Sequence, residues 1–389
     1  MTGAREKATE TRVFERVVGE YDSGVPGPLF LALGGIHGNE PSGIHAAERV
    51  LATLEKVRPA MRGRFVALAG NLEALRRKQR FVDYDLNRMW GAASIERVRN
   101  QDPALDTVEE TQQRELLSAI DALMDQAGDD GLIFLDLHSS SAPGAPFTAI
   151  NDTLQNRKIA FALPCPALIG LEENVKGPLL EYVAARGHVA VAVEGGQHDD
   201  PATIDRHEAS LWTALNAGGL IDHEAVPGVT EHYTAMKDSA RGLPGVLEIV
   251  HRHALEPGDG FKMLPGFNNF SAVKKGRQVA EDQLGDIRVM EDGYLLLPLY
   301  QGQGEDGFFL GREVRRFWLR LSTVMRLLRL DNLLPLLPGV SRHPTEREVI
   351  YANPDIVRWF AAEFFHLTGY KRCPDEDGRM VFLRRPDRR

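Results

Sequence analysis

His37 and Glu40 lie three residues apart, just after an apolar run at residues 29–33 that Gly34 and Gly35 end. Such a run is typical of a strand buried on both faces, so we expect both side chains where the chain leaves a sheet and turns into a helix. An imidazole and a carboxylate can bind the same Zn²⁺ ion. By itself, this pair fits a surface helix start with a capping glutamate equally well.

Two later segments repeat the pattern of an apolar strand followed by a polar turn. Residues 131–138 end in His138, two residues after Asp136, and residues 188–194 end in Glu194. If the sheet is parallel with helical crossovers, these strand ends share one edge. Two histidines and a carboxylate form a catalytic zinc set with one free position, and a further glutamate is available as a base. Asp136 is on the same side of its strand as His138 and could support it.

Residues 81–90 form a polar segment without helical or strand periodicity, and Arg80 precedes it. A buried irregular segment of this polarity would leave charges unpaired, so we interpret it as a functional loop. The alternative is a cluster of surface ion pairs. His198 and His207 are rival metal ligands, but we place His207 on a solvated helix face and His198 beside the proposed site.

Composition excludes several classes of protein. The 389 residues are 43% hydrophobic and carry a net charge of −9, which disfavours binding to nucleic acid and to anionic membrane surfaces. We find no signal peptide and no apolar run long enough to span a membrane, and therefore expect a cytoplasmic protein. Cys165 and Cys373 are the only cysteines, so a metal would be held by histidines and carboxylates.

The pattern of elements predicts three parts. Residues 1–228 are expected to form a catalytic α/β domain, residues 229–310 a small antiparallel β domain, and residues 311–389 an extension of an amphipathic helix, a loop and a hairpin. In the expected helix, apolar side chains from Val314 to Leu328 form a stripe opposite several arginines. We expect this stripe to dock on the β domain or on a second subunit, and membrane binding is the less favoured alternative.

Four motifs in order, GGIHGNEPSG, RFVDYDLNR, DLHSS and VEGG, resemble the succinylglutamate desuccinylase and aspartoacylase family, relatives of the zinc carboxypeptidases. The resemblance covers about residues 28–310. It implies a zinc carboxypeptidase-like mixed sheet with flanking helices, followed by a β domain. It also implies hydrolysis of an amide between a small acyl group and an amino acid.

The resemblance also implies roles for the motif residues. His37, Glu40 and His138 would hold one Zn²⁺ per chain. Glu194 would be the general base that takes a proton from zinc-bound water and passes it to the leaving amine. Arg80 would polarise the scissile carbonyl and stabilise its oxyanion.

Asn87 and Arg88 would hold a substrate carboxylate. The chain departs from the aspartoacylase pattern at two places. Phe308 and Phe309 stand where a tyrosine is expected, and only Arg186 is a candidate for binding a second carboxylate. Both departures argue against a strictly aspartate-type leaving group.

The sequence therefore predicts a zinc-dependent deacylase that acts on a small N-acyl amino acid. A metallocarboxypeptidase for short peptides is the alternative. A membrane or scaffold protein that uses residues 311–337 is a third hypothesis, and a serine hydrolase at residues 139–141 a remote fourth because no GxSxG motif is present. Substrate identity and homo-oligomerisation stay open, and Co²⁺ or Mn²⁺ could replace zinc.

Overall fold

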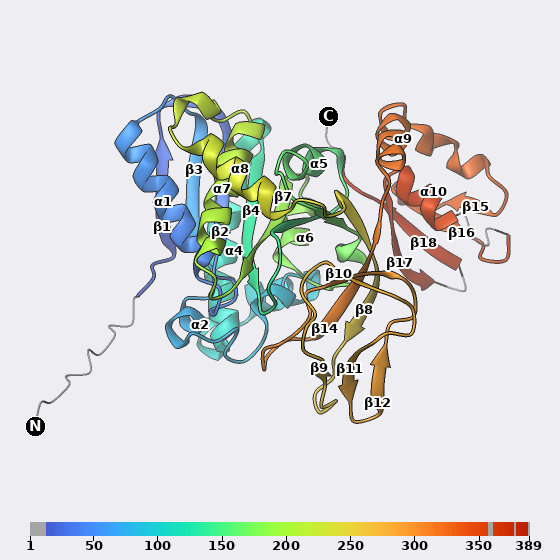
Figure 1. Cartoon of the computed structure of the whole chain (residues 1–389). Coiled ribbons are helices and arrows are strands. Elements are labelled where there is room, and N and C mark those ends of the chain that lie inside the picture. The colour runs from blue at the N-terminus through green and yellow to red at the C-terminus, as the bar shows by residue number, and fades with distance from the viewer. Residues whose placement is uncertain (1–12, 357–360, 377–378, 388–389) are drawn as a thin grey trace, which may run out of the picture.

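The computed structural model describes residues 13–356, 361–376 and 379–387. A mixed sheet of eleven strands runs through these residues in the order β1-β3-β2-β4-β7-β5-β6-β8-β14-β13-β10 (Figure 1). The strands are β1 (Val17–Asp22), β2 (Val25–Gly34), β3 (Arg62–Ala69), β4 (Leu132–Ser140), β5 (Phe147–Ile150), β6 (Ala167–Ile169), β7 (Val189–Gln197), β8 (Val246–Ala254), β10 (Ser271–Val273), β13 (Gly293–Leu296) and β14 (Asp306–Glu313). The expectation of an α/β fold with a large mixed sheet is confirmed.

The four strands β3, β2, β4 and β7 are parallel neighbours at the centre of this sheet. All nine residues of β4 are buried, as are the last six of β2, which explains why each strand contains an apolar stretch, at residues 132–135 and 29–33 respectively. Because the four strands run in one direction, the side chains at their carboxyl ends meet at one edge of the sheet. The parallel order that the sequence analysis assumed is thus present.

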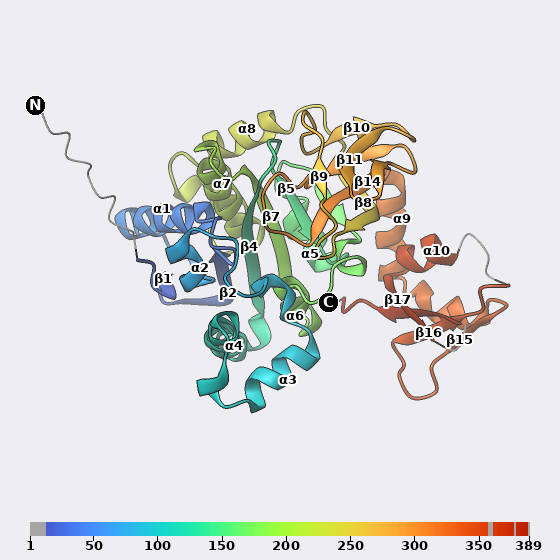
Figure 2. The same cartoon turned by 90° about the horizontal axis from the view of Figure 1, so that it is seen from below.

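Helices cover both faces of the sheet (Figure 2). On one face, α1, α5, α7 and α8 contribute to a core with residues such as Phe30 and Trp212, and on the other face α3, α4 and α6 contribute to a core around Phe134. The helices of this part of the chain are α1 (Ser42–Val57), α2 (Leu72–Arg77), α3 (Ala92–Asn100), α4 (Val108–Ala127), α5 (Leu154–Ala160), α6 (Leu179–Ala185), α7 (Ala202–Ala217) and α8 (Val229–Ser239).

The second part of the chain extends the same sheet. Strand β8 pairs in parallel with β6 and antiparallel with β14, and β13 and β10 follow. A separate small sheet consists of β9 (Lys262–Met263), β11 (Gln278–Asp282) and β12 (Gly285–Arg288). Helix α8 lies C-terminal to the expected boundary at residue 229, yet Val229 and Met236 are buried in the first core. The division into three domains stays a prediction.

The C-terminal extension holds more structure than the sequence suggested. It contains α9 (Arg316–Leu327), α10 (Ala361–Leu367) and a four-stranded sheet in the order β15-β16-β18-β17. The expected hairpin corresponds to β17 (Tyr370–Glu376) and β18 (Arg379–Arg384), whereas β15 (Val340–Arg342) and β16 (Val349–Ala352) replace part of the expected loop. Two such short strands carry too few residues for a periodic signal.

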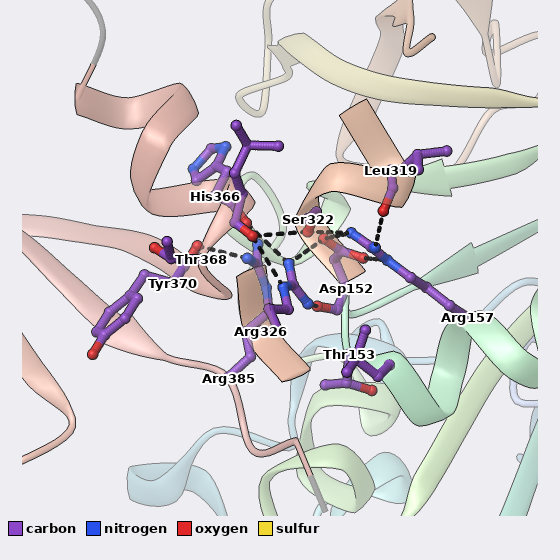
Figure 3. Close-up of polar contacts among 12 residues, drawn as sticks. Asp152, Thr153, Arg157, Leu319, Ser322, Arg326, His366, Thr368, Tyr370 and Arg385 are labelled. Atoms are coloured by element: carbon purple, nitrogen blue, oxygen red, sulfur yellow. Dashed lines mark hydrogen bonds and ion pairs between the residues drawn. The ribbon is translucent and has the colours of Figure 1, made fainter. Parts of the chain in front are cut away.

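Much of the apolar stripe of α9 stays exposed and does not dock on the β domain, so docking on a second subunit, the other expectation, stays a prediction. Phe317, Trp318 and Leu328 remain 65%, 47% and 65% exposed, while Ser322, Met325 and Arg326 are buried. Arg326 donates to the carboxylate of Asp152 at 2.7 Å, so this helix contacts the catalytic part of the chain through its polar face (Figure 3). Among the described helices, none has the length and apolarity required to cross a membrane.

Candidate metal centre and active site

Three buried side chains converge at the carboxyl edge of the parallel strands. His37 and Glu40 follow β2, and His138 lies near the end of β4, directly opposite Glu194 of β7. One ligand atom from each of His37, Glu40 and His138 lies within 4.8 Å of the other two. Two apolar strands and the turn after one of them thus bring His37 and His138, 101 positions apart in sequence, into one cluster.

The turn that carries His37 is held in place by close backbone packing. Gly38 donates its N–H to the carbonyl of Arg80 at 3.1 Å. A Cβ atom at Gly38 would lie 2.0 Å from the carbonyl carbon of Ala74 in α2, so only glycine fits here. This position therefore fixes the turn that carries His37 and Glu40 against the segment that leads to Arg80.

Each imidazole is held between two carboxylates. Nδ1 of His37 lies 3.0 Å from Glu40, and Nε2 of the same ring lies 3.1 Å from Asp85. Nδ1 of His138 lies 3.3 Å from Glu40, and its Nε2 lies 3.0 Å from Asp136. Metal-binding histidines characteristically place their second ring nitrogen against a carboxylate, which orients the ring and raises its basicity. The donor set and its supports therefore fit a Zn²⁺ ion held by Nδ1 of both rings and by Glu40.

The charges in the cluster favour a cation. Burial by itself would raise the pKa of Glu40, but His37 and His138 hold it well below its usual range. Burial would likewise lower the pKa of His138, yet Asp136 and Glu40 hold it well above its usual range. The carboxylates thus stabilise positive charge at the point where the two rings meet, and a metal ion there would take the place of the proton.

Glu194 is partly exposed to the cavity, but its Oε2 atom is enclosed and has no hydrogen-bond partner among the described residues. Burial raises the pKa of this carboxyl to about 7. A carboxyl group with a pKa near neutrality can both accept and return a proton at physiological pH. Its position directly opposite His138 places it beside the cluster of His37, Glu40 and His138.

Arg80 is held beside the cluster by two acids. Its Nη2 and Nε atoms donate to Oδ2 of Asp85 at 2.9 and 3.2 Å, and its Nη1 donates to Glu40 at 3.3 Å. The loop after Arg80 is ordered by Glu109 of α4, a fully buried carboxylate that accepts the backbone N–H groups of residues 82–84. The polar segment at residues 81–90 is thus part of the site rather than a set of surface ion pairs.

Asn87 and Arg88 line the same cavity but are already engaged. Asn87 Oδ1 accepts the N–H of Leu179 at 2.9 Å. Arg88 donates through Nη2 to Asp306 of β14 at 2.7 Å, while its buried Nε has no hydrogen-bond partner in the described structure. Asp306 reaches the cavity from a strand more than 200 residues away in sequence, and no sequence pattern indicated it.

Three residues considered from the sequence lie elsewhere. His207 is fully buried beneath Gly195, and burial lowers its pKa to about 3, so the interpretation of a solvated face is wrong. Its helix packs directly on β7, which periodicity alone could not place. His198 contacts the hydroxyl of Ser139 at 2.8 Å rather than the ligand cluster. Arg186 lies over the ring of Tyr182 at 3.5 Å and does not line the cavity.

The cavity over the cluster has a volume of about 150 Å³. It contains the three ligand residues together with Arg80, Arg88 and Glu194, and apolar side chains such as Phe147 and Phe309 form other walls. Pockets for drug-sized ligands are larger, about 300–1,000 Å³. The space therefore suits a small substrate.

Comparison with known proteins supports the assignment of the fold and the catalytic domain. Residues 26–196 match the family model described as the succinylglutamate desuccinylase/aspartoacylase catalytic domain. A succinylglutamate desuccinylase from Pseudomonas paraeruginosa is 40% identical over 86 residues, which are 22% of this chain and 24% of that protein. The aligned segment thus spans only about a quarter of this relative.

Solved structures match over more of the chain. A succinylglutamate desuccinylase/aspartoacylase from Rhodobacter sphaeroides has a TM-score of 0.54 at 18% identity, covering 75% of this chain and 87% of that one. Murine aminoacylase 3 has a TM-score of 0.51 at 17% identity, covering 74% and 96%. At these identities the structures show a shared fold. The chain therefore carries, in residues 26–196, a catalytic domain of the succinylglutamate desuccinylase/aspartoacylase family.

Proposed function

We propose that this protein hydrolyses the amide bond of a small N-acyl amino acid, with one Zn²⁺ ion held by His37, Glu40 and His138. One observation carries the proposal: three buried ligands converge beside a glutamate, Glu194, whose Oε2 has no partner in the described part of the chain. Two histidines and a carboxylate leave a fourth zinc position free, as a hydrolytic site requires. When bound, zinc polarises a carbonyl and lowers the pKa of water to about 7.

Glu194 is the proton carrier in this proposal. Its carboxylate takes a proton from the attacking water and delivers it to the nitrogen of the leaving amine, so one group serves both halves of the reaction. The pKa of about 7 that burial gives this carboxyl suits both transfers at neutral pH. A fully solvated glutamate, with a pKa near 4.3, would be a weaker base.

Arg80 and Arg88 bind different negatively charged groups, the oxyanion of the reacting carbonyl and the carboxylate of the amino acid. Arg80 is held by Asp85 and Glu40 at the edge of the ligand cluster, where its guanidinium can stabilise the oxyanion that forms from the scissile carbonyl. Nε of Arg88 has no hydrogen-bond partner in the described structure, although Glu305 lies 3.7 Å away, and it can bind the carboxylate of the amino acid together with the Asn87 amide. The names of the relatives, desuccinylase and aminoacylase, support an N-acyl amino acid as the substrate.

The decisive experiment measures primary-amine release by the zinc-loaded protein from acetyl-, succinyl- and longer-acyl amino acids and from dipeptides. Release from acyl amino acids, abolished in Glu194→Gln, would support the proposal. Cleavage of dipeptides alone would favour a peptidase, and no release from any compound would overturn the hydrolase assignment. The expected cytoplasmic location stays a prediction.

A further inference from the structure

The cavity has a second acidic group that the proposed reaction does not use. Glu172, in the short helical turn Leu171–Glu173, contributes to the cavity wall together with Leu171 and Val175. Its side chain is 2% exposed, and its Oε2 atom has no hydrogen-bond partner among the residues that the structure describes. A buried carboxylate oxygen without a donor is costly unless a ligand supplies that donor.

The other carboxylate oxygen of Glu172 is fixed by the C-terminal extension. Arg385 donates to Oε1 through Nε at 3.0 Å and through Nη2 at 2.9 Å. Nη2 also donates to Glu173 at 2.7 Å, and Nη1 donates to the carbonyl of Tyr370 at 2.6 Å. Four of the five N–H groups of Arg385 are therefore engaged, and this arginine has little left to offer a substrate.

The extension is itself anchored next to this wall. Arg326 of α9 donates to both the side chain and the backbone carbonyl of Asp152, which follows the cavity residue Asn151 (Figure 3). Arg385 lies beside Arg326 in the same buried cluster (Figure 3). The extension thus holds the side of the cavity that contains Glu172 in a fixed position.

From this arrangement we propose that Glu172 selects substrates whose amino-acid side chain ends in an amine and rejects those that carry a second carboxylate. The inference rests on the proposed hydrolysis of N-acyl amino acids and names the class of amino acid. An ammonium group would complete the hydrogen bonding of Oε2 between otherwise apolar walls. A second carboxylate would instead meet a buried acid whose arginine is already occupied.

The segment that carries Glu172 is tied to the carboxylate-binding side of the cavity. The N–H of Leu179 donates to Asn87 Oδ1 at 2.9 Å, and the N–H of Trp90 donates to the carbonyl of Gly177 at 3.0 Å. These bonds join residues 171–180 to the turn that holds Asn87 and Arg88. In the proposal, a substrate whose carboxylate binds Arg88 turns its side chain, rather than its acyl group, toward this neighbouring wall.

The test compares kcat/KM for two series of Nα-acetyl amino acids of matched length: ornithine, norvaline and glutamate, and lysine, norleucine and 2-aminoadipate. In at least one series, we expect kcat/KM for the amine compound to exceed kcat/KM for the carboxylate compound by about 10- to 100-fold. This factor corresponds to the free energy of a hydrogen bond to a charged group. In Glu172→Gln this ratio should fall about tenfold. Glu173→Gln is the matched control, because Glu173 shares Arg385 but does not line the cavity, and its ratio should not change.

Equal or better hydrolysis of the carboxylate compounds by the wild-type protein would overturn the inference, even if Glu172→Gln failed to fold. Binding of the free amino acids, measured by calorimetry, separates this inference from the proposed function. Hydrolysis without a Glu172-dependent preference would refute the selection by Glu172 and leave the deacylase. Glu172-dependent binding of lysine or ornithine without any hydrolysis would retain the subsite and refute the deacylase.

Discussion

Oδ1 of Asp85 lies 3.1 Å from Nε2 of His37, while Oδ2 of the same carboxylate accepts two hydrogen bonds from Arg80. One side chain in an irregular loop therefore orients both a proposed metal ligand and the proposed oxyanion donor. Burial would raise the pKa of Asp85, but Arg80 and His37 hold it well below its usual range, so the carboxylate is ionised. The site depends on this residue although no reacting atom touches it.

Replacing Asp85 with asparagine should weaken zinc binding. Removing the carboxylate that contacts the second ring nitrogen of a metal-binding histidine typically lowers metal affinity about 10- to 100-fold. The carboxylate both orients the ring and raises the basicity of the ligand nitrogen. Competition with a chromophoric chelator measures this change. Asp83→Asn is the control, since Asp83 lies in the same loop but, among the described residues, accepts only the backbone N–H of Val108 at 3.1 Å. Equal zinc affinity in Asp85→Asn and in the wild-type protein would remove Asp85 from the metal centre.

Replacing Arg80 with alanine should lower kcat by about 100- to 1,000-fold and change KM little, because an oxyanion donor acts mainly in the transition state. Zinc content must be measured alongside, since Arg80 also contacts Glu40. Arg76→Ala serves as the control, because this arginine is exposed and, in the part of the chain that the structure describes, pairs only with Glu73 of its own helix. An unchanged kcat in fully loaded Arg80→Ala would exclude the proposed role.

The ligand cluster could be predicted because each of its members ends or follows an apolar strand. His37, His138 and Glu194 are far apart in sequence, yet the parallel order of β2, β4 and β7 brings them to one edge. That inference needs only strand periodicity and the rule that parallel strands end at the same side. The residues that the strands place directly were therefore accessible to sequence reasoning.

Residues that reach the site from loops or from distant strands could not be placed in this way. Asp306 meets Arg88 across more than 200 residues, and Glu172 meets Arg385 across 213 residues. Both contacts depend on how the later parts of the chain pack on the first, which local patterns do not encode. The same reason explains why the contact of α9 with Asp152 was not predicted: it is made by the buried Arg326, while Phe317, Trp318 and Leu328 of the apolar stripe stay exposed.

The contact between the extension and the catalytic part should fail when its central acid is neutralised. Asp152 binds Arg157 at 2.8 Å and Arg326 at 2.7 Å, and all three side chains are buried. Asp152→Asn leaves the buried guanidinium of Arg157 without its counter-ion and that of Arg326 with only the more distant Asp387 at 3.9 Å, which should cost about 3–5 kcal/mol in the free energy of unfolding. Urea unfolding measures this change, and limited proteolysis shows whether the extension opens first.

The control for this prediction is Asp292→Asn, which removes an exposed ion pair with Lys274 and should change the free energy of unfolding far less than Asp152→Asn does. If Asp152→Asn were as stable as this control, the buried cluster would not hold the extension in place. A loss confined to the extension would appear as early cleavage after residue 313 with the remaining core intact.

The contact between the C-terminal extension and the rest of the chain should also weaken at high pH because of His366 in α10. Its Nε2 lies 3.3 Å from Glu173 and its Nδ1 lies 3.3 Å from Glu248 of β8. Burial would lower the pKa of His366, but these two carboxylates raise it to about 9, above the value of about 6.5 in an unfolded chain. The stabilisation is therefore complete below pH 6.5 and is lost as the pH rises through 9, by an amount on the order of 1–3 kcal/mol.

The measurement is the melting temperature of the wild-type protein minus that of His366→Asn, followed from pH 6 to pH 10. We expect this difference to shrink as the pH rises, because only the wild-type protein loses a favourable charge. His251→Asn is the control, since His251 is an exposed side chain on the strand that carries Glu248. The difference in melting temperature between the wild-type protein and His251→Asn should not shrink with pH in the same way. A difference for His366→Asn that stays constant across this range would show that the imidazolium does not link α10 to β8.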